Sequence, residues 1–245
     1  IMRYFIKLAY NGTPYHGWQS QPNASTVQET LEKALTLLFK TKIEIVGAGR
    51  TDAGVHAKCM FAHFDFVESI DKLYWIPKLN SFLPKEIVIY DIIQVHDEAH
   101  ARFDANQRTY EYHIHTFKDP FYKDLSWYHA LPLDVEKMNE ASKILMEYTD
   151  FECFSKTHTD VFTFNCKITG AFWTLKSNQI IFTISADRFL RNMVRAIVGT
   201  LIQIGLGKSE VQHLRHIIES KKRSLAGFSV PAHGLYLTDI KYPYL

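Results

Sequence analysis

The sequence predicts an α+β fold in which a mixed sheet packs against helices. Segments with the two-residue alternation of β-strands are joined both by helical segments and by hairpin turns, which is typical of this class. Strand–helix–strand–strand units occur in both halves, which we place at residues 1–104 and 105–245. Because 47% of the 245 residues are hydrophobic, the chain can bury a sizeable core.

The first half begins with a strand and a helix. Residues 2–10 alternate as a strand does. Ser25 or Thr26 opens a capping box with Gln28 or Glu29, so a helix begins there. Its core face consists of apolar residues at helical spacing, namely Val27, Leu31, Leu35 and Leu38.

Three further strands are predicted in this half. β-branched and aromatic residues favour strands at 43–46, 59–66 and 87–95. A mostly helical stretch begins near Ile70, and Pro77 is expected to bend or break it.

The second half repeats this alternation. Strands are predicted at 107–116, 165–175, 179–185 and 235–240, and the middle two form a hairpin. Helices are predicted after Asp134, from Asp187 to Ile204, and from Ser209 to Ile218. The polar and aromatic segment 148–164 is expected to be irregular.

Composition excludes several classes of protein. No apolar run approaches about 18 residues, so no membrane-spanning helix is expected. The first residues read as a strand and not as a signal peptide. Cys59, Cys153 and Cys166 form no CxxC pair, so we expect core thiols in a protein of the reducing cytoplasm.

Nucleotide and metal motifs fail on inspection. A dinucleotide fingerprint that starts at Gly47 needs glycine where Asp52 stands, and a P-loop that ends at Lys208 needs glycine where Ile202 stands. His113 and His115 share a strand face, and His213 and His216 a helix face, but neither pair has a third ligand at recognisable spacing. We therefore predict no metal site and interpret His113 and His115 as surface histidines.

The glycine-rich loop at 47–57 carries the most informative acid. It contains three glycines, Arg50 and Asp52 between two apolar strands. One interpretation is that Asp52 accepts backbone hydrogen bonds and caps the turn. The other is that Arg50 helps to keep a partly buried Asp52 ionised, which makes it a competent nucleophile.

Basic residues gather near the C-terminus. The net charge is only +2, but residues 187–223 hold eight basic and three acidic residues. On a helix that begins at Asp187, Arg188, Arg191 and Arg195 would lie within about 60° of one another, opposite an apolar face. This row favours recognition of carboxylate or phosphate, and the loop Lys221, Lys222 and Arg223 would extend it. An ordinary solvated charged face is the alternative.

Tyr110 lies on the predicted strand 107–116, two residues after Arg108. It is either a core tyrosine or a ring that stacks on a flipped base, which needs an aromatic face and a charged anchor nearby.

Several segments together resemble the tRNA pseudouridine synthase A family. They occur in the family's order and spacing and cover almost the whole chain: Tyr10–Gly12 with Gly17–Gln19, Gly49–Ala57, His100–Phe103 with Arg108, Tyr110 and Tyr112, Phe189–Arg195, and Gly234–Leu237. The resemblance implies the pseudouridine synthase fold, a mixed and mainly antiparallel central sheet flanked by helices, with two similar α/β halves around a catalytic cleft.

The resemblance also implies a function. It predicts a cofactor-free isomerase that acts on uridines at positions 38, 39 and 40 in the anticodon stem-loop of tRNA, and a homodimer that holds each tRNA with both subunits. The family's catalytic aspartate corresponds to Asp52, its substrate-contacting tyrosine to Tyr110, and the arginine that pairs with the aspartate to Arg195. Arg50 corresponds to an arginine placed against the RNA near the extruded base.

Two other functions remain open from the residues themselves. A non-catalytic module that binds RNA stem-loops would use the same arginines, although an acid that faces phosphate weakens pure binding. A phosphate- or nucleotide-binding enzyme is disfavoured by the failed motifs.

Overall fold

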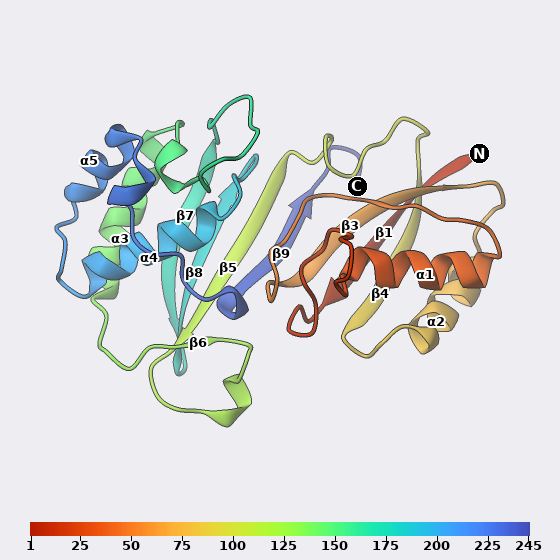
Figure 1. The fold of residues 1–245 in the computed structure, drawn as a ribbon, viewed down its shortest axis with the longest axis horizontal. Helices are drawn as coiled ribbons and strands as arrows, with labels where there is room; N and C mark the ends of the chain where they lie inside the picture. Colours follow the sequence, from red (N-terminus) through yellow and green to blue (C-terminus); the bar gives the residue numbers. More distant parts are fainter. The chain divides into compact units, whose positions relative to one another are not determined.

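The computed structural model describes residues 1–245 and divides into two compact units (Figure 1). Unit 1 comprises Ile1–Asn106 and Tyr236–Leu245, and unit 2 comprises Gln107–Leu235. The C-terminal segment Tyr236–Leu245 thus belongs to unit 1 together with the first 106 residues.

The sheet of unit 1 is mixed and mainly antiparallel. Its strands lie in the order β4-β1-β3-β9, where β1 is antiparallel to both of its neighbours and β9 runs parallel to β3. A two-residue strand, β2, pairs with β3 off this path. The bounds are β1 Met2–Tyr10, β2 Val46–Gly47, β3 His56–Phe66, β4 Ile87–Val95 and β9 Leu235–Lys241.

Two helices complete the core of unit 1. Thr26 caps α1 (Val27–Phe39) by accepting a hydrogen bond from the backbone N–H of Glu29, as the capping box predicts. Asp71 caps α2 (Lys72–Phe82), which continues through Pro77 as one helix and is not broken. Phe39 of α1 packs against both the sheet and α2. Its ring centroid lies 4.7 Å from that of Phe66 on β3 and 4.6 Å from that of Trp75 on α2.

The strand predicted at 43–46 is wrong except for Val46. The backbone of this segment bonds to side chains of α1 and not to a neighbouring strand. The N–H of Ile43 donates to Thr36 Oγ1 at 3.0 Å, and the N–H of Ile45 donates to Glu32 Oε1 at 2.9 Å. These bonds satisfy the polar groups of an extended segment, so Ile43 and Ile45 are buried without a strand partner.

Unit 2 contains a mainly antiparallel sheet and three helices (Figure 1). Its strands lie in the order β5-β8-β7, and the two-residue strand β6 runs parallel to β5. The predicted hairpin is confirmed, with Ser177 at φ 52° in its turn. The bounds are β5 Gln107–His115, β6 Trp127–Tyr128, α3 Val135–Ile144, β7 Ile168–Lys176, β8 Gln179–Ala186, α4 Met193–Gly205 and α5 His213–Ser220. Both units therefore bear out the predicted α+β fold.

Two predicted helix starts are wrong. Helix α4 begins at Met193 and not at Asp187, because Asn192 has φ 68°, which a continuing right-handed helix cannot contain. Before it, the Asp187 carboxylate accepts hydrogen bonds from the N–H groups of Lys167 and Arg188, which fixes a loop. Helix α5 begins at His213, so Ser209 is not its cap. Asp134 does cap α3, through the N–H of Lys137.

The three cysteines are free and buried, as predicted. Burial raises the pKa of Cys153 to about 12 and that of Cys166 to about 11, so these thiols stay protonated at neutral pH. None of the helices has the length and apolarity that crossing a membrane requires.

Candidate active site

Asp52 lies in unit 1, in a tight turn that leads into β3. The N–H of Val55 donates to the carbonyl oxygen of Asp52 at 3.1 Å and closes the turn. Gly54 has φ 81° at the third position, where a type II turn requires positive φ. The backbone of Asp52 thus defines the turn, and its side chain is half-buried, whereas Arg50 is exposed.

Thr51 anchors this turn to the first strand. Its Oγ1 lies 2.8 Å from the hydroxyl oxygen of Tyr10, and both residues are buried. Its carbonyl oxygen accepts a hydrogen bond from the N–H of Trp18 at 3.2 Å. The residue that precedes Asp52 is therefore held through both its side chain and its backbone.

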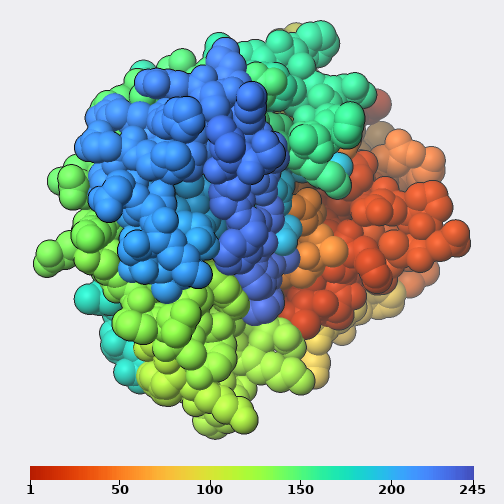
Figure 2. Space-filling view, turned by 60° about the vertical axis from the view of Figure 1, so that its left-hand side comes forward, coloured from red at the N-terminus to blue at the C-terminus, as the bar shows by residue number.

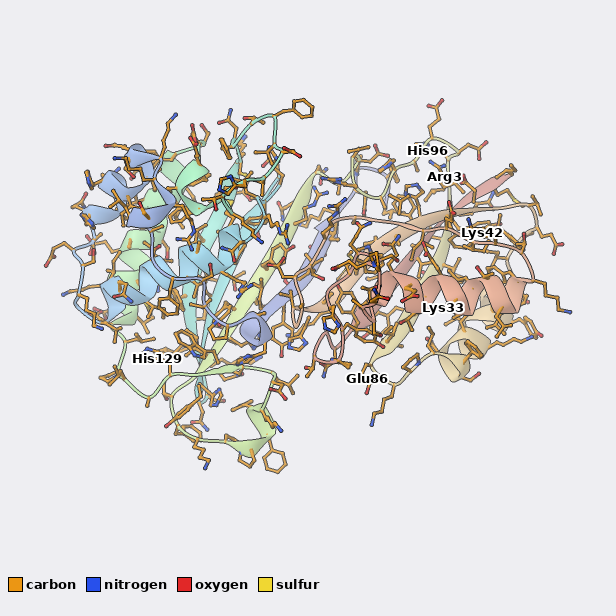
Figure 3. The ribbon with its side chains drawn as sticks, viewed as in Figure 1. Arg3, Lys33, Lys42, Glu86, His96 and His129 are labelled. Carbon is orange, nitrogen blue, oxygen red and sulfur yellow. The ribbon has the colours of Figure 1, made fainter.

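The loop after β1 packs closely against the same turn. Gly17 has φ 84°, and a Cβ there would lie 2.4 Å from the Thr51 carbonyl oxygen, so only glycine fits. The carbonyls of Gly17 and Trp18 accept hydrogen bonds from Val27 and Gln28, the first N–H groups of α1. On its other side the loop bonds to Glu86, whose carbonyl accepts from the N–H of Asn11 (Figure 3).

His56 is a second buried polar residue behind the turn, which the sequence analysis did not single out. Its Nδ1 accepts a hydrogen bond from the N–H of Gly12 at 3.0 Å, so the ring's proton is on Nε2. The His56 ring lies 4.7 Å from that of Tyr236 on β9, and Lys58 Nζ lies 5.0 Å from the same Tyr236 ring. His56 lies within the Gly49–Ala57 segment quoted for the family resemblance, but its bond to Gly12 joins residues 44 apart.

Arg195 lies in unit 2, in the first turn of α4. Its Nε donates to the carbonyl oxygen of Val230 at 2.7 Å, and its own carbonyl accepts from the N–H of Val230 at 3.3 Å. This reciprocal pair fixes the guanidinium relative to the segment that follows α5. The two Nη groups, which can engage a carboxylate side by side, are not used in the bond to Val230.

A network around Ser229 holds that segment in place. Asn192 Nδ2 donates to Ser229 Oγ at 2.6 Å, and Arg223 Nη2 donates to the same oxygen at 3.0 Å. Arg223 Nη1 also donates to the carbonyl of Gly227 at 2.9 Å. Arg223, predicted to extend a phosphate-binding row, thus makes bonds within unit 2 that hold the segment containing Val230, to which Arg195 donates.

Tyr112 supports the same segment from the sheet. Its hydroxyl donates to the carbonyl of Pro231 at 2.7 Å, and its ring leaves no room for a Cβ at Gly234. Burial raises the pKa of Tyr112, and the nearby Arg195 cation opposes that rise. Tyr112 is therefore a neutral hydrogen-bond donor.

Tyr110 is half-buried on β5, where it pairs with Ile184 of β8. Its ring meets that of Phe189 edge to face, at 5.2 Å and 90°. Phe189 lies in the loop before α4, so this contact connects the strand to the loop that leads to Arg195.

The predicted arginine row does not form. Arg188 and Arg191 precede α4, and only Arg195 lies on the helix. Arg188 Nη1 donates to the carbonyls of Thr163 and Asn165, at 3.1 and 3.3 Å. Arg191 is exposed, and its carbonyl accepts from the N–H of Lys156.

The basic residues after α5 differ in their surroundings. Both Lys221 and Lys222 are exposed, and Lys221 Nζ lies 2.8 Å from Asp150 Oδ2. Figure 2 shows one face of unit 2, where the blue surface of α5 and the following residues lies above the yellow-green surface of the segment between β5 and β6.

The histidine pairs do not form metal sites in residues 1–245, where no group of three or more His, Cys, Asp or Glu side chains could hold a metal ion. His113 and His115 are buried and not on the surface as predicted. His113 Nε2 lies 2.8 Å from Glu111 Oε2 two residues earlier, which satisfies that ring nitrogen without a metal.

Comparison with known proteins gives a consistent result. The family model described as tRNA pseudouridine synthase matches residues 7–104 and 143–243. A protein of Parabacteroides distasonis named tRNA pseudouridine synthase A is 55% identical over 244 residues, which are 99% of this chain and 97% of that protein. Proteins of the same name from Bacteroides thetaiotaomicron and Syntrophomonas wolfei are 52% and 41% identical, with 99% of this chain covered and 91% and 98% of theirs.

Proposed function

The chain belongs to the tRNA pseudouridine synthase family, and from this premise we propose that Asp52 is the nucleophile of its reaction. The protein is an isomerase that converts uridine in tRNA to pseudouridine. The reaction breaks the C1′–N1 glycosidic bond, turns the uracil and rejoins it through C5. C5 loses its hydrogen as a proton and N1 gains one, so the atoms of the uridine balance. Asp52 would add to C1′ of the ribose or to C6 of the uracil, and is released when the new C–C bond is complete.

The observation that carries this proposal is the anchoring of the turn. The Tyr10–Thr51 contact, the bond from Trp18 to Thr51 and the closure of the turn on the Asp52 carbonyl all fix the backbone next to the carboxylate. A nucleophile gains most when its position is set before the substrate binds, because little freedom is then lost on reaching the transition state. No other acid of unit 1 combines half-burial with such a glycine-rich turn.

The other site residues take roles that follow from their chemistry. Arg195 would hold the Asp52 carboxylate ionised and oriented through its Nη groups, while its Nε remains on Val230. Tyr110 would stack on the uracil and exclude water, which would otherwise hydrolyse the bond at C1′. Arg50, exposed on the Asp52 loop, would contact the RNA near the extruded base.

We propose that the target uridines lie in the anticodon stem-loop, at tRNA positions 38, 39 and 40, and that two copies of the chain hold one tRNA. Exposed basic residues of unit 2 would supply contacts to phosphate, and Arg191 and Lys222 are among them. Arg188, Lys221 and Arg223 already make bonds within unit 2, so their contribution to RNA binding is smaller.

The experiment is to incubate the full chain with a tRNA transcript and to map pseudouridine by carbodiimide-dependent primer-extension stops. Stops at positions 38, 39 and 40 support the proposal, and a transcript with cytidine at those positions should give none. Stops elsewhere would move the target out of the anticodon stem-loop. Tight tRNA binding without any stop would favour a stem-loop binding module, and sedimentation of the chain with and without tRNA tests the dimer.

A further inference from the structure

Unit 2 contains a pocket that the proposed reaction does not use. It is lined by the end of β5, by β6 and by the segment that joins them, which contains the short 3₁₀ helix Pro120–Tyr122. Figure 1 shows this segment as the loop next to the label of β6. Figure 3 labels His129, the residue that directly follows β6. The cavity measures about 310 Å³, which is at the lower end of the range for small-molecule sites.

Two buried polar atoms in its lining have no hydrogen-bond partner in the protein. They are His115 Nδ1 and Ser126 Oγ, on side chains that are 4% and 2% exposed. A buried donor or acceptor without a partner is costly, so native structures rarely keep one without a ligand or water to fill the role. Both residues line the same cavity although they come from different segments.

Aromatic rings surround the same position. The His115 ring lies 5.4 Å from that of Tyr128 and 5.1 Å from that of Tyr122. Tyr128 is 47% exposed, so part of its surface remains accessible at the rim. Rings of this kind give a flat apolar surface for a planar group.

Charges in the lining balance one another. Lys118 and Lys123 contribute two positive charges, and Asp119 and Asp124 two negative ones. The Asp119 carboxylate also accepts the N–H of Phe121 as a helix cap. A pocket without net charge favours a neutral planar heterocycle over a bare phosphate, and the lysines suit phosphates on either side of it.

We infer that this pocket binds one unpaired nucleobase of the tRNA, away from the catalytic loop. His115 Nδ1 and Ser126 Oγ would hydrogen-bond to the edge of the base, and the tyrosines would contact its face. The inference rests on tRNA as the substrate of the proposed function. It adds a second contact point that would hold the RNA without taking part in the isomerisation.

The test uses two variants that remove the unpartnered atoms and keep the shape. Ser126→Ala and His115→Phe should each weaken binding of a tRNA transcript by about three- to tenfold, the value of one hydrogen bond. Neither should lower the melting temperature, because no internal bond is lost, and kcat at saturating tRNA should stay unchanged.

Ser142→Ala is the matched control, since this buried hydroxyl donates to the Met138 carbonyl at 2.7 Å. It should lower the melting temperature and leave tRNA affinity unchanged.

Three results decide the inference. A Kd for tRNA within twofold of wild type in both variants would mean that the pocket holds only water. If wild type bound a free nucleoside and Ser126→Ala did not, while both proteins had the same Kd for tRNA, the pocket would bind free nucleosides and not a base of tRNA. That result would overturn the inference. If wild type made no pseudouridine while both variants still weakened tRNA binding, the pocket would stand and the proposed function would fail.

Discussion

The hydroxyl oxygen of Tyr10 lies 2.8 Å from Oγ1 of Thr51, the residue that directly precedes Asp52. Tyr10 ends the first strand, and the contact spans 41 residues of sequence. It ties the proposed nucleophile to the sheet, so the position of Asp52 depends on a strand that contributes nothing to the chemistry.

We predict that Tyr10→Phe lowers the turnover of tRNA by about ten- to a hundredfold while tRNA affinity changes little. Without the hydroxyl the turn gains freedom, and a small displacement of a nucleophile has a large effect on rate. The free energy of unfolding should fall by about 1 kcal/mol. Single-turnover pseudouridine formation and chemical denaturation measure the two effects.

Tyr4→Phe is the matched control for this variant. Tyr4 lies on the same strand, and its hydroxyl donates to the carbonyl of Glu68 at 3.3 Å, in a part of unit 1 that does not touch the Asp52 turn. It should lose similar stability and keep its turnover. Equal turnover in both variants would show that the Tyr10–Thr51 contact does not position Asp52.

Arg195→Lys should reduce kcat by about a hundredfold, an effect comparable to the loss of one preorganised donor. A lysine cannot donate to the Val230 carbonyl and also engage a carboxylate side by side. Rapid-quench measurement with saturating tRNA gives the rate. Arg188→Lys, on an arginine that donates to loop carbonyls, should stay close to wild type. Near-normal turnover in Arg195→Lys would remove Arg195 from the site.

Lys222 and Arg223 are neighbours in sequence but should respond differently to alanine. Lys222→Ala should weaken tRNA binding without loss of stability. The slope of the logarithm of the binding constant against the logarithm of the salt concentration should become shallower by about one. Arg223→Ala should lower the free energy of unfolding by about 1–3 kcal/mol, because the bonds to Gly227 and Ser229 are lost. Filter binding at several salt concentrations and thermal melting separate the two. The distinction fails if Arg223→Ala changes only tRNA affinity.

The free energy of unfolding should decrease at acidic pH because of the titration of His63. Burial, aided by the Arg3 cation and by His100, lowers the pKa of His63 to about 4 in the folded chain, against 6.5 for the free side chain. Between these pH values the unfolded chain binds the proton and the folded chain does not. The free energy of unfolding should therefore drop by about 1–3 kcal/mol as the pH falls from 6.5 to 4.

His63→Gln tests this prediction, because glutamine does not titrate and can still accept the N–H of Ala101, which now donates to His63 Nδ1 at 3.1 Å. Its stability should depend less on pH over this window, as followed by urea denaturation. The same slope in both proteins would assign the acid sensitivity to other groups.

Most elements of the fold follow from local patterns in the sequence. Residues 2–10, 87–95 and 107–115 alternate or are β-branched, and their partners in the sheet do not change that pattern. Thr26 and Asp134 cap helices as expected because a cap needs only residues within one turn.

The errors arise where distant groups compete with local propensity. Ile43 and Ile45 have strand propensity, but side chains of α1 take their backbone bonds. The apolar spacing around Leu190 suits a helix, yet the Asp187 carboxylate also accepts the N–H of Lys167 from the preceding strand region and holds a loop, which ends at the left-handed Asn192. The bonds to α1 and to Lys167 have no short-range signature.

The residues of the candidate site could be predicted from the sequence, but the contacts that hold them could not. Asp52, Arg50, Tyr110 and Arg195 were candidates from the residues themselves, and a family resemblance that spans the chain gave each of them its role. The Tyr10–Thr51 contact and the bond from Gly12 to His56 could not be predicted, because each joins segments more than 40 residues apart. Ser126 and His115 belong to no motif and become notable only when their burial is known.

The central claim is that Asp52 is the nucleophile, and pseudouridine mapping with Asp52→Asn tests it most directly. Asparagine keeps the size of the side chain and removes its charge, so tRNA affinity should be retained. Asp71→Asn, at the cap of α2, controls for the substitution because asparagine caps helices as well as aspartate does. We predict full carbodiimide stops in wild type and Asp71→Asn and none in Asp52→Asn. Pseudouridine formation by Asp52→Asn at an appreciable rate would contradict the nucleophile role.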